Sequence, residues 1–403
     1  MNTRRALAFI FCTVSLDVLA LGVMIPVLPT IVLGFMGGDT AGAAEMFGVF
    51  ATVWALMQFL CSPLLGALSD RYGRRPVILI SCLGLGLDYI FMALAPSLLP
   101  LLVGRIVSGI TSATIGTSVA YIADVTKPEE RAKAFGLVGM AFGLGFVVGP
   151  AIGGLLGSVD SRLPFWVSAA ACLANAAFGW FVLPESLPPE RRMEFSWKRA
   201  NSVGSLKLLA SHRQLLGLAA VDFLGNFAHQ VLPAVFVLYA GHRYGWGETT
   251  VGLTLAFVGI CTAFVQGGLI GPIVSRLGAR RALIVGLLAG AAGMAIYGLA
   301  ATGPWFWAGV PVMAFWGIAG PALQDMMTRR VSGSEQGQLQ GATSASRSIA
   351  GLVAPGVFAV LFASTIDSVP GAAFLLAGAL LAAAAVVTWI VTGGRTRPAA
   401  PVP

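Results

Sequence analysis

Charged side chains are scarce in this 403-residue sequence, where Asp, Glu, Lys and Arg together make up 10% of the residues. Water-soluble domains carry about 25%, whereas hydrophobic residues here reach 57% and the mean hydropathy is +0.85. Histidine and cysteine number only three and five, and they form no cluster typical of a metal site, a disulfide framework or a nucleophile. A phosphate-binding loop of the Gly-x4-Gly-Lys-Ser/Thr type is missing as well. These absences exclude a water-soluble globular protein, and they predict that the chain is not an enzyme, holds no metal or cofactor and does not use ATP.

Long apolar runs, in contrast, fill the whole chain. Each has roughly 20 residues or more, enough to cross a hydrocarbon core of about 30 Å. We expect twelve membrane-spanning helices, at residues 6–32, 43–68, 76–95, 98–123, 132–157, 163–183, 213–240, 248–275, 281–301, 304–328, 338–363 and 370–392. The predicted fold class is an all-α membrane protein of two pseudo-symmetric six-helix bundles. Their predicted bounds are residues 1–184 and 212–403, joined by a cytoplasmic linker at 185–211 that has room for a short interfacial helix.

Basic residues mark one side of the predicted membrane protein. Of the 25 Lys and Arg residues, 21 lie before the first span, after the last one or in alternate connections, and the other connections hold only Arg162 and Arg243. By the positive-inside rule both termini and the central linker are cytoplasmic, which requires an even number of spans. We therefore interpret the net charge of +8 as membrane topology, and we expect the lipid bilayer, not a nucleic acid, as the partner.

A charged turn between the second and third predicted spans occurs twice in the chain. The first copy is Gly66-Ala-Leu-Ser-Asp-Arg-Tyr-Gly-Arg-Arg75, and four of its residues, Gly66, Arg71, Gly73 and Arg75, recur as Gly271, Arg276, Gly278 and Arg280. A duplicated turn predicts a two-halved membrane protein. The copies are unequal, because Ser275 and Ala279 stand where the first copy has Asp70 and Arg74.

The first copy is interpreted as a gate. Gly66 is expected to allow close packing, and Gly73 is expected to adopt the positive φ of a tight turn. Asp70 needs a partner at the membrane edge, and the candidates are Arg74, Asp124 and a helix N-terminus of the other half. Such a cluster can latch one conformation, so the predicted gating residues here are Gly66, Asp70, Arg71, Gly73, Arg74 and Asp124. A loop that only sets topology also needs basic residues, but it gives no reason for Asp70 or the two glycines.

The fifth predicted span is rich in glycine. Gly145, Gly149 and Gly153 are four residues apart and form one stripe without side chains, and Pro150 adds a bend. Two compatible interpretations are a tight helix crossing and a hinge or seal between helices that move against each other. We assign Gly149, Pro150 and Gly153 to gating as well.

Several charged residues fall inside spans, where each is costly and therefore a functional candidate. Counted at about 1.5 Å per residue, Asp17, Asp88 and Asp222 lie near mid-bilayer, Arg347 lies near the middle and Arg105 lies nearer the outer side. Carboxyl groups in an apolar core can bind and release protons, because desolvation disfavours their charged form. We assign proton coupling to Asp17, Asp88 and Asp222, with Arg105 as the modulator of Asp17 and Asp88. Alternatively, Asp17 or Asp88 forms a neutral pair with Arg105 that only fixes helix positions.

Polar residues gather around Asp222. Asn226 and His229 follow at i+4 and i+7 and share its helix face, with Gln230 beside them. An imidazole above a buried carboxylate could relay protons or meet a cationic ligand, and a structural histidine is equally compatible with the pattern. The predicted substrate-binding residues are Gln58, Asn226, His229, Gln230 and Arg347.

Other polar side chains within spans have simpler interpretations. Gln58 is expected to line a cavity, whereas Asn175 and Gln266 predict hydrogen bonds between helices. Asp325 either pairs with Arg329 at the surface or faces a basic residue across the bundle, for which Arg347 is the candidate.

Several motifs together resemble those of known transporters. The motifs Gly66-x-Leu-Ser-Asp-Arg-Tyr-Gly-Arg-Arg, Gly104-Arg105-Ile-Val-Ser-Gly109 and Gly145-x3-Gly149-Pro150-x2-Gly153-Gly154 are similar, in that order, to the loop signature, the fourth-helix proton-linked motif and the fifth-helix antiporter motif of the major facilitator superfamily. The segments that begin at Leu16, Gly22, Leu56, Asp88, Ala120 and Gly337 resemble the bacterial tetracycline efflux proteins more closely. This similarity spans nearly the whole chain and is strong in the first half.

The resemblance implies a major facilitator fold in the bacterial inner membrane. It also implies export of a tetracycline-type drug, as a divalent metal chelate, in exchange for protons by alternating access, with roles in transport for Asp17, Asp88 and Arg105. We expect a functional monomer. In the second half the chain departs from the family, whose ninth-helix aspartate and eighth-helix histidine would fall near Gly290 and Thr262. Asp222 is our hypothesis for the acid that replaces the missing one.

Three other functions stay open. The first is export of another amphipathic antibiotic, or multidrug antiport. The second is proton-coupled import of a nutrient, which the Gly149-Pro150 motif disfavours. The third is a sensor or membrane enzyme that transports nothing, for which no catalytic constellation is present.

Overall fold

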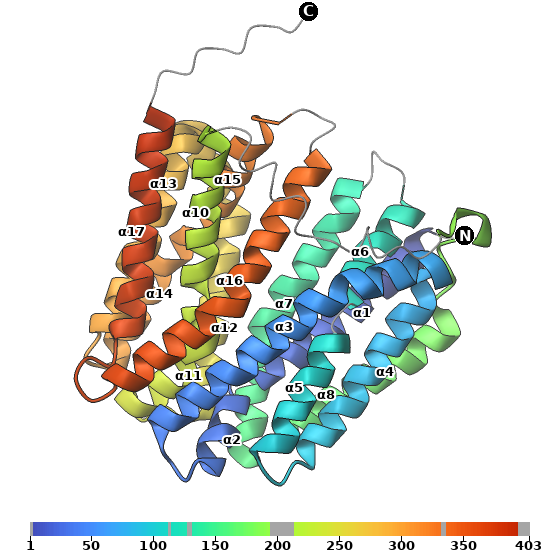
Figure 1. The fold of residues 1–403 in the computed structure, drawn as a ribbon, viewed down its shortest axis with the longest axis horizontal. Helices are drawn as coiled ribbons and strands as arrows, with labels where there is room; N and C mark the ends of the chain where they lie inside the picture. The colour runs from blue at the N-terminus through green and yellow to red at the C-terminus, as the bar shows by residue number, and fades with distance from the viewer. Residues whose placement is uncertain (1–2, 112–113, 127–130, 194–212, 332–335, 394–403) are drawn as a thin grey trace, which may run out of the picture. The chain divides into compact units, whose positions relative to one another are not determined.

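The computed structural model describes residues 3–111, 114–126, 131–193, 213–331 and 336–393, and no strand occurs among them. The helical elements, labelled in Figure 1 where there is room, are α1 (Thr3–Met24), α2 (Leu28–Phe35), α3 (Thr40–Tyr72), α4 (Arg74–Ala93), α5 (Leu98–Thr111), α6 (Thr114–Val125), α7 (Arg131–Val159), α8 (Leu163–Val182), η2 (Pro189–Arg191), α10 (Arg213–His229), α11 (Val231–Tyr244), α12 (Glu248–Phe264), the π-helical turn η4 (Val265–Leu269), α13 (Ile270–Leu299), α14 (Gly303–Ala314), the 3-10 turn η5 (Phe315–Ile318), α15 (Ala319–Thr328), α16 (Gln336–Thr365) and α17 (Ala372–Gly393).

Eleven helical segments in the described ranges are long and apolar enough to cross a membrane. One of them, Glu248–Leu299, has 52 residues, which at about 1.5 Å per residue is more than twice the roughly 30 Å of a hydrocarbon core. This segment breaks at Gly278, whose φ of 74° and ψ of 156° are not helical. The break lies between the predicted spans 248–275 and 281–301, so the prediction of an all-α membrane protein with twelve spans is confirmed.

Local sequence sets where these helices begin and end. The Oδ1 atom of Asp39 accepts hydrogen bonds from the backbone N–H groups of Ala41 and Gly42 at 3.1 Å, and this caps the start of α3. At the other end of α3 stands Gly73, with a φ of 109°. All residues with positive φ in the described part of the chain are glycines, which have no Cβ to oppose that conformation. The positive φ predicted at Gly73 is confirmed.

The chain divides into two compact units, each built from three stretches of sequence. The first unit contains Met1–Asn201, Val231–Ile260 and Gly351–Pro370, and the second contains Ser202–Gln230, Cys261–Ala350 and Gly371–Pro403. The bundle bounds predicted at residues 184 and 212 stay a prediction. The interfacial helix expected in the linker falls mostly on residues 194–211, which lie outside the described ranges.

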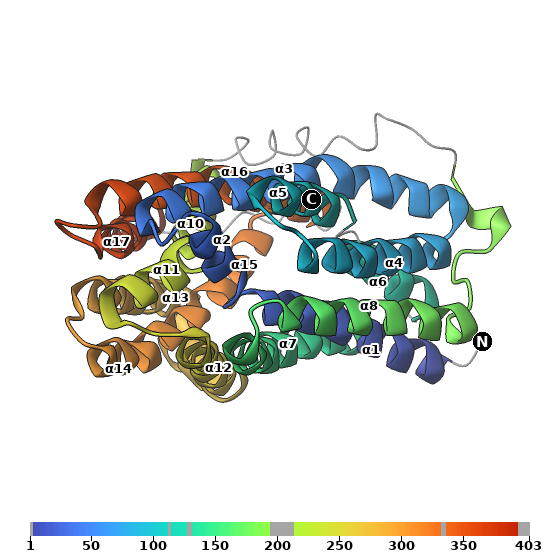
Figure 2. The same ribbon diagram turned by 90° about the horizontal axis from the view of Figure 1, so that it is seen from below.

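The first unit is organised around α1. This helix packs against α7 and α8, and α4 packs against α8 and α5; Figure 2 shows α1, α7 and α8 side by side. Its hydrophobic core includes the buried side chains Ile10, Val14, Ile78, Tyr121 and Leu183. This core therefore joins the helices that carry Asp17 and Asp88.

The second unit is organised around α13 and α17. Helix α17 packs against α13 and against α10 (Figure 1). Tyr297 of α13 stacks on Phe306 of α14 with ring centroids 4.0 Å apart, and Phe374 of α17 meets Tyr297 edge-on. The α10–α17 contact is close because Gly217 has no side chain: a Cβ there would lie 2.5 Å from Val391 Cγ2. These contacts hold α10, the helix that carries Asp222.

Candidate functional site

Asp17 lies at a point where three helices meet. It is 8% exposed on α1, and its Oδ1 accepts a hydrogen bond from Asn175 Nδ2 of α8 at 3.3 Å and one from the Cys82 thiol of α4 at 3.9 Å. Asn175 Nδ2 also donates to the Thr13 carbonyl at 3.3 Å. The hydrogen bond between helices that was predicted for Asn175 is confirmed, and it fixes the position of the Asp17 carboxyl group.

Asp88 on α4 has a different environment. Only 3% of the residue is exposed, and neither carboxyl oxygen has a hydrogen-bond partner among the described residues. Gly104 of α5 leaves room beside it, since a Cβ at that position would come within 3.1 Å of Asp88 Oδ1. A carboxyl group that is buried without donors costs much less to keep neutral than charged. Asp88 is therefore a group suited to hold a proton in this conformation.

Arg105 directly follows Gly104 on α5 and so lies near the Asp88 carboxyl group. In the described part of the chain no ion pair within 4.0 Å joins the two residues. The guanidinium carbon of Arg105 instead lies 5.3 Å from the centroid of the Trp54 ring of α3, a cation–π contact. This conformation thus does not contain the Asp88–Arg105 pair that was one alternative from the sequence, and Arg105 is held near Asp88 without binding it.

Arg74, the first residue of α4, is the centre of the predicted gate. Its Nη1 lies 2.6 Å from Asp70 Oδ1 and donates to Ser69 Oγ, also at 2.6 Å. Its Nε donates to Asp124 Oδ2 of α6 at 3.2 Å. The Arg74 side chain is 11% exposed, whereas that of Asp70 is 41% exposed, so water screens this pair on the side of Asp70. Arg74 therefore lies between the carboxylates of Asp70 and Asp124, which are two of the groups that the sequence analysis brought together. The gating role of this cluster stays a prediction.

Glu185, just after α8, completes this cluster from another part of the chain. Its Oε1 accepts hydrogen bonds from the backbone N–H groups of Arg74, Ser186 and Leu187 at 2.9 to 3.0 Å, and its Oε2 accepts one from Arg75 at 3.3 Å. A carboxylate here satisfies free N–H groups at the start of α4 and complements the helix dipole.

The same segment reaches the gate at two further points. Ser186 Oγ donates to Asp124 Oδ2 at 3.1 Å, and the Met193 N–H donates to the Asp70 carbonyl at 3.1 Å. At Gly73 a Cβ would overlap the Glu185 carboxylate, so this glycine is needed for space as well as for φ. No motif in the sequence predicts these contacts, because Glu185 and Arg74 are 111 positions apart.

Replacing Glu185 with glutamine is expected to destabilise the protein by about 1 kcal/mol. The amide keeps one acceptor oxygen and loses the charge at the start of α4. The thermal midpoint of the purified protein measures the effect, and Glu190→Gln, at an exposed position in η2, is the matched control. Equal midpoints for the wild type and Glu185→Gln would contradict the capping role.

The second copy of the turn repeats one contact of the first. Arg75 Nη2 donates to the Trp180 carbonyl of α8 at 2.6 Å, and its guanidinium lies 5.6 Å from that ring. Arg280 Nη2 donates to the Trp389 carbonyl of α17 at 3.3 Å and lies 5.0 Å from the ring. Gly278 has a positive φ, as Gly73 does. The duplication inferred from the sequence therefore extends to an arginine–tryptophan contact, which the sequence pattern did not predict.

The glycine stripe of α7 lies against α1, as a tight helix crossing requires. A Cβ on Gly149 would lie 2.8 Å from Gly22 Cα and 2.9 Å from the Leu19 carbonyl, and a Cβ on Gly153 would overlap the Val23 carbonyl. The tight crossing predicted from the sequence is confirmed.

The adjacent face of α7 is equally close to α12. At Gly154 a Cβ would overlap the Glu248 carbonyl and lie 3.0 Å from Gly252 Cα. The Pro150 carbonyl lies beside Gly252 in the same way. The helix that carries Gly149, Pro150 and Gly153 is thus held by backbone contacts on two sides, and its role as a hinge stays a prediction.

Asp222 on α10 is the buried acid of the second unit in the described ranges. It is 9% exposed, and its Oδ1 lies 3.9 Å from Arg347 Nη2 of α16. Asn226 Nδ2 donates to the Asp222 backbone carbonyl at 2.7 Å. Asp325 pairs instead with Arg329 at 2.8 Å on an exposed face. The two alternatives for Asp325 are thereby decided in favour of the surface pair, and Arg347 belongs with Asp222.

His229 is the last residue of α10. Two elements of the second unit, η4 and η5, depart from α-helical geometry. The ring centroid of His229 is 5.7 Å from that of Trp316 in the 3-10 turn η5. Next to Trp316, a Cβ on Gly317 would lie 3.3 Å from Gln266 in the π-helical turn η4, and Gln230 occupies the break between α10 and α11. Irregular turns inside spans often mark functional sites. Helical periodicity gave no sign of η4 or η5.

Gly290 of α13 explains how the second unit accommodates Trp316. A Cβ on Gly290 would lie 2.8 Å from Trp316 Cγ and 3.0 Å from Leu381 Cδ1. An acid at this position, where the resemblance places one, would have to displace the tryptophan. Among the described residues of the second unit, the buried carboxyl group is that of Asp222 on α10.

Three predicted residues have less defined surroundings. The close packing expected at Gly66 is wrong for this conformation, because a Cβ there would meet no atom within 4 Å. Arg71 is exposed, and its guanidinium lies 5.2 Å from the Tyr72 ring. Gln58 is half-buried on α3, and its place in a cavity lining stays a prediction.

Comparison with known proteins places this arrangement in a family. A family model described as Major Facilitator Superfamily matches residues 7–355. The chain is 39% identical to the tetracycline resistance protein, class C, of Escherichia coli, covering 94% of this chain and 95% of that protein. It is 36% identical to the class G protein of Vibrio anguillarum, covering 91% and 93%.

Solved structures show the same fold. The nucleoside transporter NupG has a TM-score of 0.77 at 13% identity, covering 97% of this chain and 99% of that one. The human organic anion transporter MFSD10 has a TM-score of 0.71 at 23% identity, covering 96% and 100%. The described residues contain eleven candidate membrane spans, and the family model and the bacterial tetracycline resistance proteins match most of the chain. The protein is therefore a transporter of the inner membrane and not an enzyme. The protein belongs to the Major Facilitator Superfamily and, within it, groups with the tetracycline resistance proteins.

Proposed function

We propose that this protein exports a tetracycline-type drug in exchange for protons. The observation that carries the proposal is Asp88, which is buried and without hydrogen-bond donors in the described chain. The neighbouring helix α5 carries Arg105, which forms no ion pair with Asp88 within 4.0 Å. A single acid of this kind can be charged in one state of a transport cycle and neutral in another. The substrate class is supported by the names of the relatives, which are tetracycline resistance proteins.

The cycle follows from the positions of the acids. A proton that enters from outside binds at Asp17, Asp88 or Asp222 and displaces the drug, and Arg105 modulates the charge near Asp88. The two halves then change their exposure by alternating access, with the glycine stripe of α7 as the hinge. The cluster of Asp70, Arg74 and Asp124 holds the outward-open form until its bonds break.

The cargo is proposed to be the drug as a chelate with a divalent cation. Carboxylate, amide and imidazole groups suit such a ligand, and they are present as Asp222, Asn226 and His229. Gln58, Gln230 and Arg347 complete the proposed binding set. We further propose that the protein works as a monomer with both termini in the cytoplasm, as its basic connections predict.

Another amphipathic antibiotic is the second candidate for the cargo. The observation in its favour is Trp316, whose ring fills the space beside Gly290 and lies next to His229. An aromatic surface at this point suits a planar apolar ligand. The chain is also 29% identical to multidrug resistance protein 2 of Bacillus subtilis, over 85% of each chain.

A drug panel in an exporter-deficient host tests the proposal. Cells that express the protein are expected to tolerate more tetracycline and to accumulate less of the labelled drug than cells with an empty vector. Cells that express Asp17→Asn at the same level are expected to behave like the empty vector. If no compound of the panel shows a difference between wild type and empty vector, drug export is wrong; higher accumulation of the drug would indicate import.

The pair of Asp222 and Arg347 gives a separate prediction. We expect Asp222→Asn and Arg347→Gln each to reduce drug-driven proton exchange about tenfold, because removal of one partner leaves the other charge uncompensated in the membrane. The double variant is expected to lose less than the two single effects combined. Proton flux in everted vesicles measures all three. Wild-type flux in Asp222→Asn would contradict the assignment of Asp222 to coupling.

A further inference from the structure

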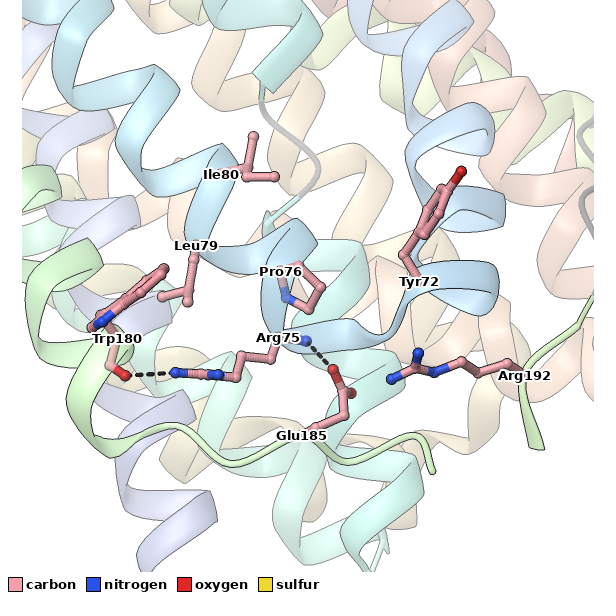
Figure 3. A pocket seen from close by; sticks show the side chains of 8 residues that line it. All are labelled: Tyr72, Arg75, Pro76, Leu79, Ile80, Trp180, Glu185 and Arg192. Carbon is pink, nitrogen blue, oxygen red and sulfur yellow. Dashed lines mark hydrogen bonds between the residues drawn. The ribbon is translucent and has the colours of Figure 1, made fainter. Parts of the chain in front are cut away.

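A pocket of about 440 Å³ lies at the end of the first unit that carries the charged turn. Figure 3 shows its lining, to which α3, α4, α8 and the chain after α8 contribute. The residues that matter for its chemistry are Arg75 and Arg192, the rings of Tyr72 and Trp180, the apolar side chain of Ile80, and Glu185. None of them belongs to the proposed drug or proton site.

The pocket joins an apolar wall to a basic rim. Ile80 and Trp180 are each 66% exposed, and they lie within the candidate spans Arg74–Ala93 and Leu163–Val182. Arg75 is at the first turn of its span, and Arg192 lies beyond the end of the other span. Tryptophan and arginine at such a level are typical of the boundary between hydrocarbon and water. A ligand in this pocket therefore meets lipid on one side and water on the other.

The two arginines of the pocket, Arg75 and Arg192, are able to bind an anion. Neither Arg75 nor Arg192 forms an ion pair within 4.0 Å in the described part of the chain. The Arg75 Nε atom is buried and has no hydrogen-bond acceptor among the described residues. Figure 3 shows the two guanidinium groups on opposite sides of Glu185, whose carboxylate oxygens accept four backbone N–H bonds. Two cations and one anion leave a single positive charge.

We propose that this pocket binds the phosphodiester headgroup of an anionic phospholipid, such as phosphatidylglycerol, in the leaflet on the predicted cytoplasmic side. Arginine is suited to phosphate, because its planar guanidinium can donate two hydrogen bonds to the same group. A phosphodiester carries one negative charge, which matches the single positive charge of the site. The acyl chains lie along Ile80 and Trp180, which a free phosphate would leave uncovered. Basic pockets between helices at this membrane level are known to take anionic headgroups.

Native mass spectrometry of the purified full-length protein tests the proposal. The detergent-solubilised protein is titrated with dioleoyl-phosphatidylglycerol and, separately, with dioleoyl-phosphatidylcholine, which has the same chains and no net charge. We expect preferential binding of the anionic lipid, and a loss of about fivefold in that preference in Arg192→Gln and in Arg75→Gln. Arg191→Gln is the matched control, because Arg191 is the exposed neighbour of Arg192 and does not line the pocket.

Three results would overturn the proposal. Equal binding of the two lipids by the wild type would exclude a headgroup site of this charge. The same loss in Arg191→Gln as in Arg192→Gln would indicate attraction by surface charge in general. Binding of glycerol 3-phosphate as tight as that of phosphatidylglycerol would assign the pocket to a soluble phosphate. Arg192 is exposed, so its variant is expected to fold, and an unchanged thermal midpoint verifies this.

Discussion

Replacement of Asp88 by asparagine is expected to reduce drug-driven proton exchange by about a hundredfold or more, the scale of effect when a proton-transfer group is removed. Asparagine has nearly the same shape but cannot bind and release a proton. The variant should still fold, because the site holds no donor for a carboxylate in the described chain and a neutral amide is tolerated there at least as well as a charge. Proton release from everted vesicles after addition of tetracycline and Mg²⁺ measures the effect, and drug susceptibility of the host gives a second readout.

The matched control for this experiment is Asp325→Asn. Asp325 is also a helical aspartate, but it is partly exposed and paired with Arg329 at the surface, where an ion pair contributes little. We expect wild-type exchange in this variant. If Asp88→Asn exchanged protons at the wild-type rate while Asp17→Asn did not, the coupling site would be Asp17, which Asn175 already orients.

The second large effect is expected at the glycine stripe. Gly149→Ala places a methyl group 2.8 Å from Gly22 Cα and 2.9 Å from the Leu19 carbonyl. Both are backbone atoms, so no flexible side chain can move aside, and α1 and α7 must separate. Overpacking of this kind costs about 1 to 3 kcal/mol. We expect a lower thermal midpoint, and a loss of drug resistance larger than the loss of protein in the membrane, because the hinge is changed as well.

Gly143→Ala is the control for this prediction. It is the same substitution in the same helix, at an exposed position where a Cβ meets no atom within 4 Å. Replacement of an exposed helical glycine by alanine is neutral or slightly stabilising. Equal midpoints and equal drug resistance for Gly149→Ala and Gly143→Ala would show that the α1–α7 crossing is not as close as the structure places it.

Features with a short sequence period were predictable. The apolar runs gave the twelve spans, and the glycines four residues apart in α7 gave the stripe that contacts α1. The second copy of the turn gave the connection between the predicted spans 248–275 and 281–301, and the structure breaks there at Gly278, with a φ of 74°. The ion pair of Arg74 with Asp70 was also predictable, because the two residues are only four positions apart in the charged turn.

Contacts between distant parts of the chain were not predictable in this way. Glu185 caps α4 from 111 positions away, and Ser186 reaches Asp124 from 62 positions away. Neither residue type is unusual after a span, so composition and spacing carry no signal. Trp316 was missed for another reason: its place depends on two helices losing their regular geometry, and an apolar sequence gives no indication of η4 or η5. For Gly66 the sequence predicted close packing that the structure does not contain. A glycine in a motif does not by itself imply that another element packs against it.

The hydrogen bond from Met193 to the Asp70 carbonyl bears on where a foreign segment can be inserted after α8. Glu185 and Met193 bind the charged turn, and Ser186 binds Asp124, so contacts to the gate continue beyond residue 184. A fragment that stops at residue 184 loses the cap of α4 and one of the two donors to Asp124 Oδ2. A fragment that stops after Met193 retains both. A tag inserted after α8 should therefore follow Met193.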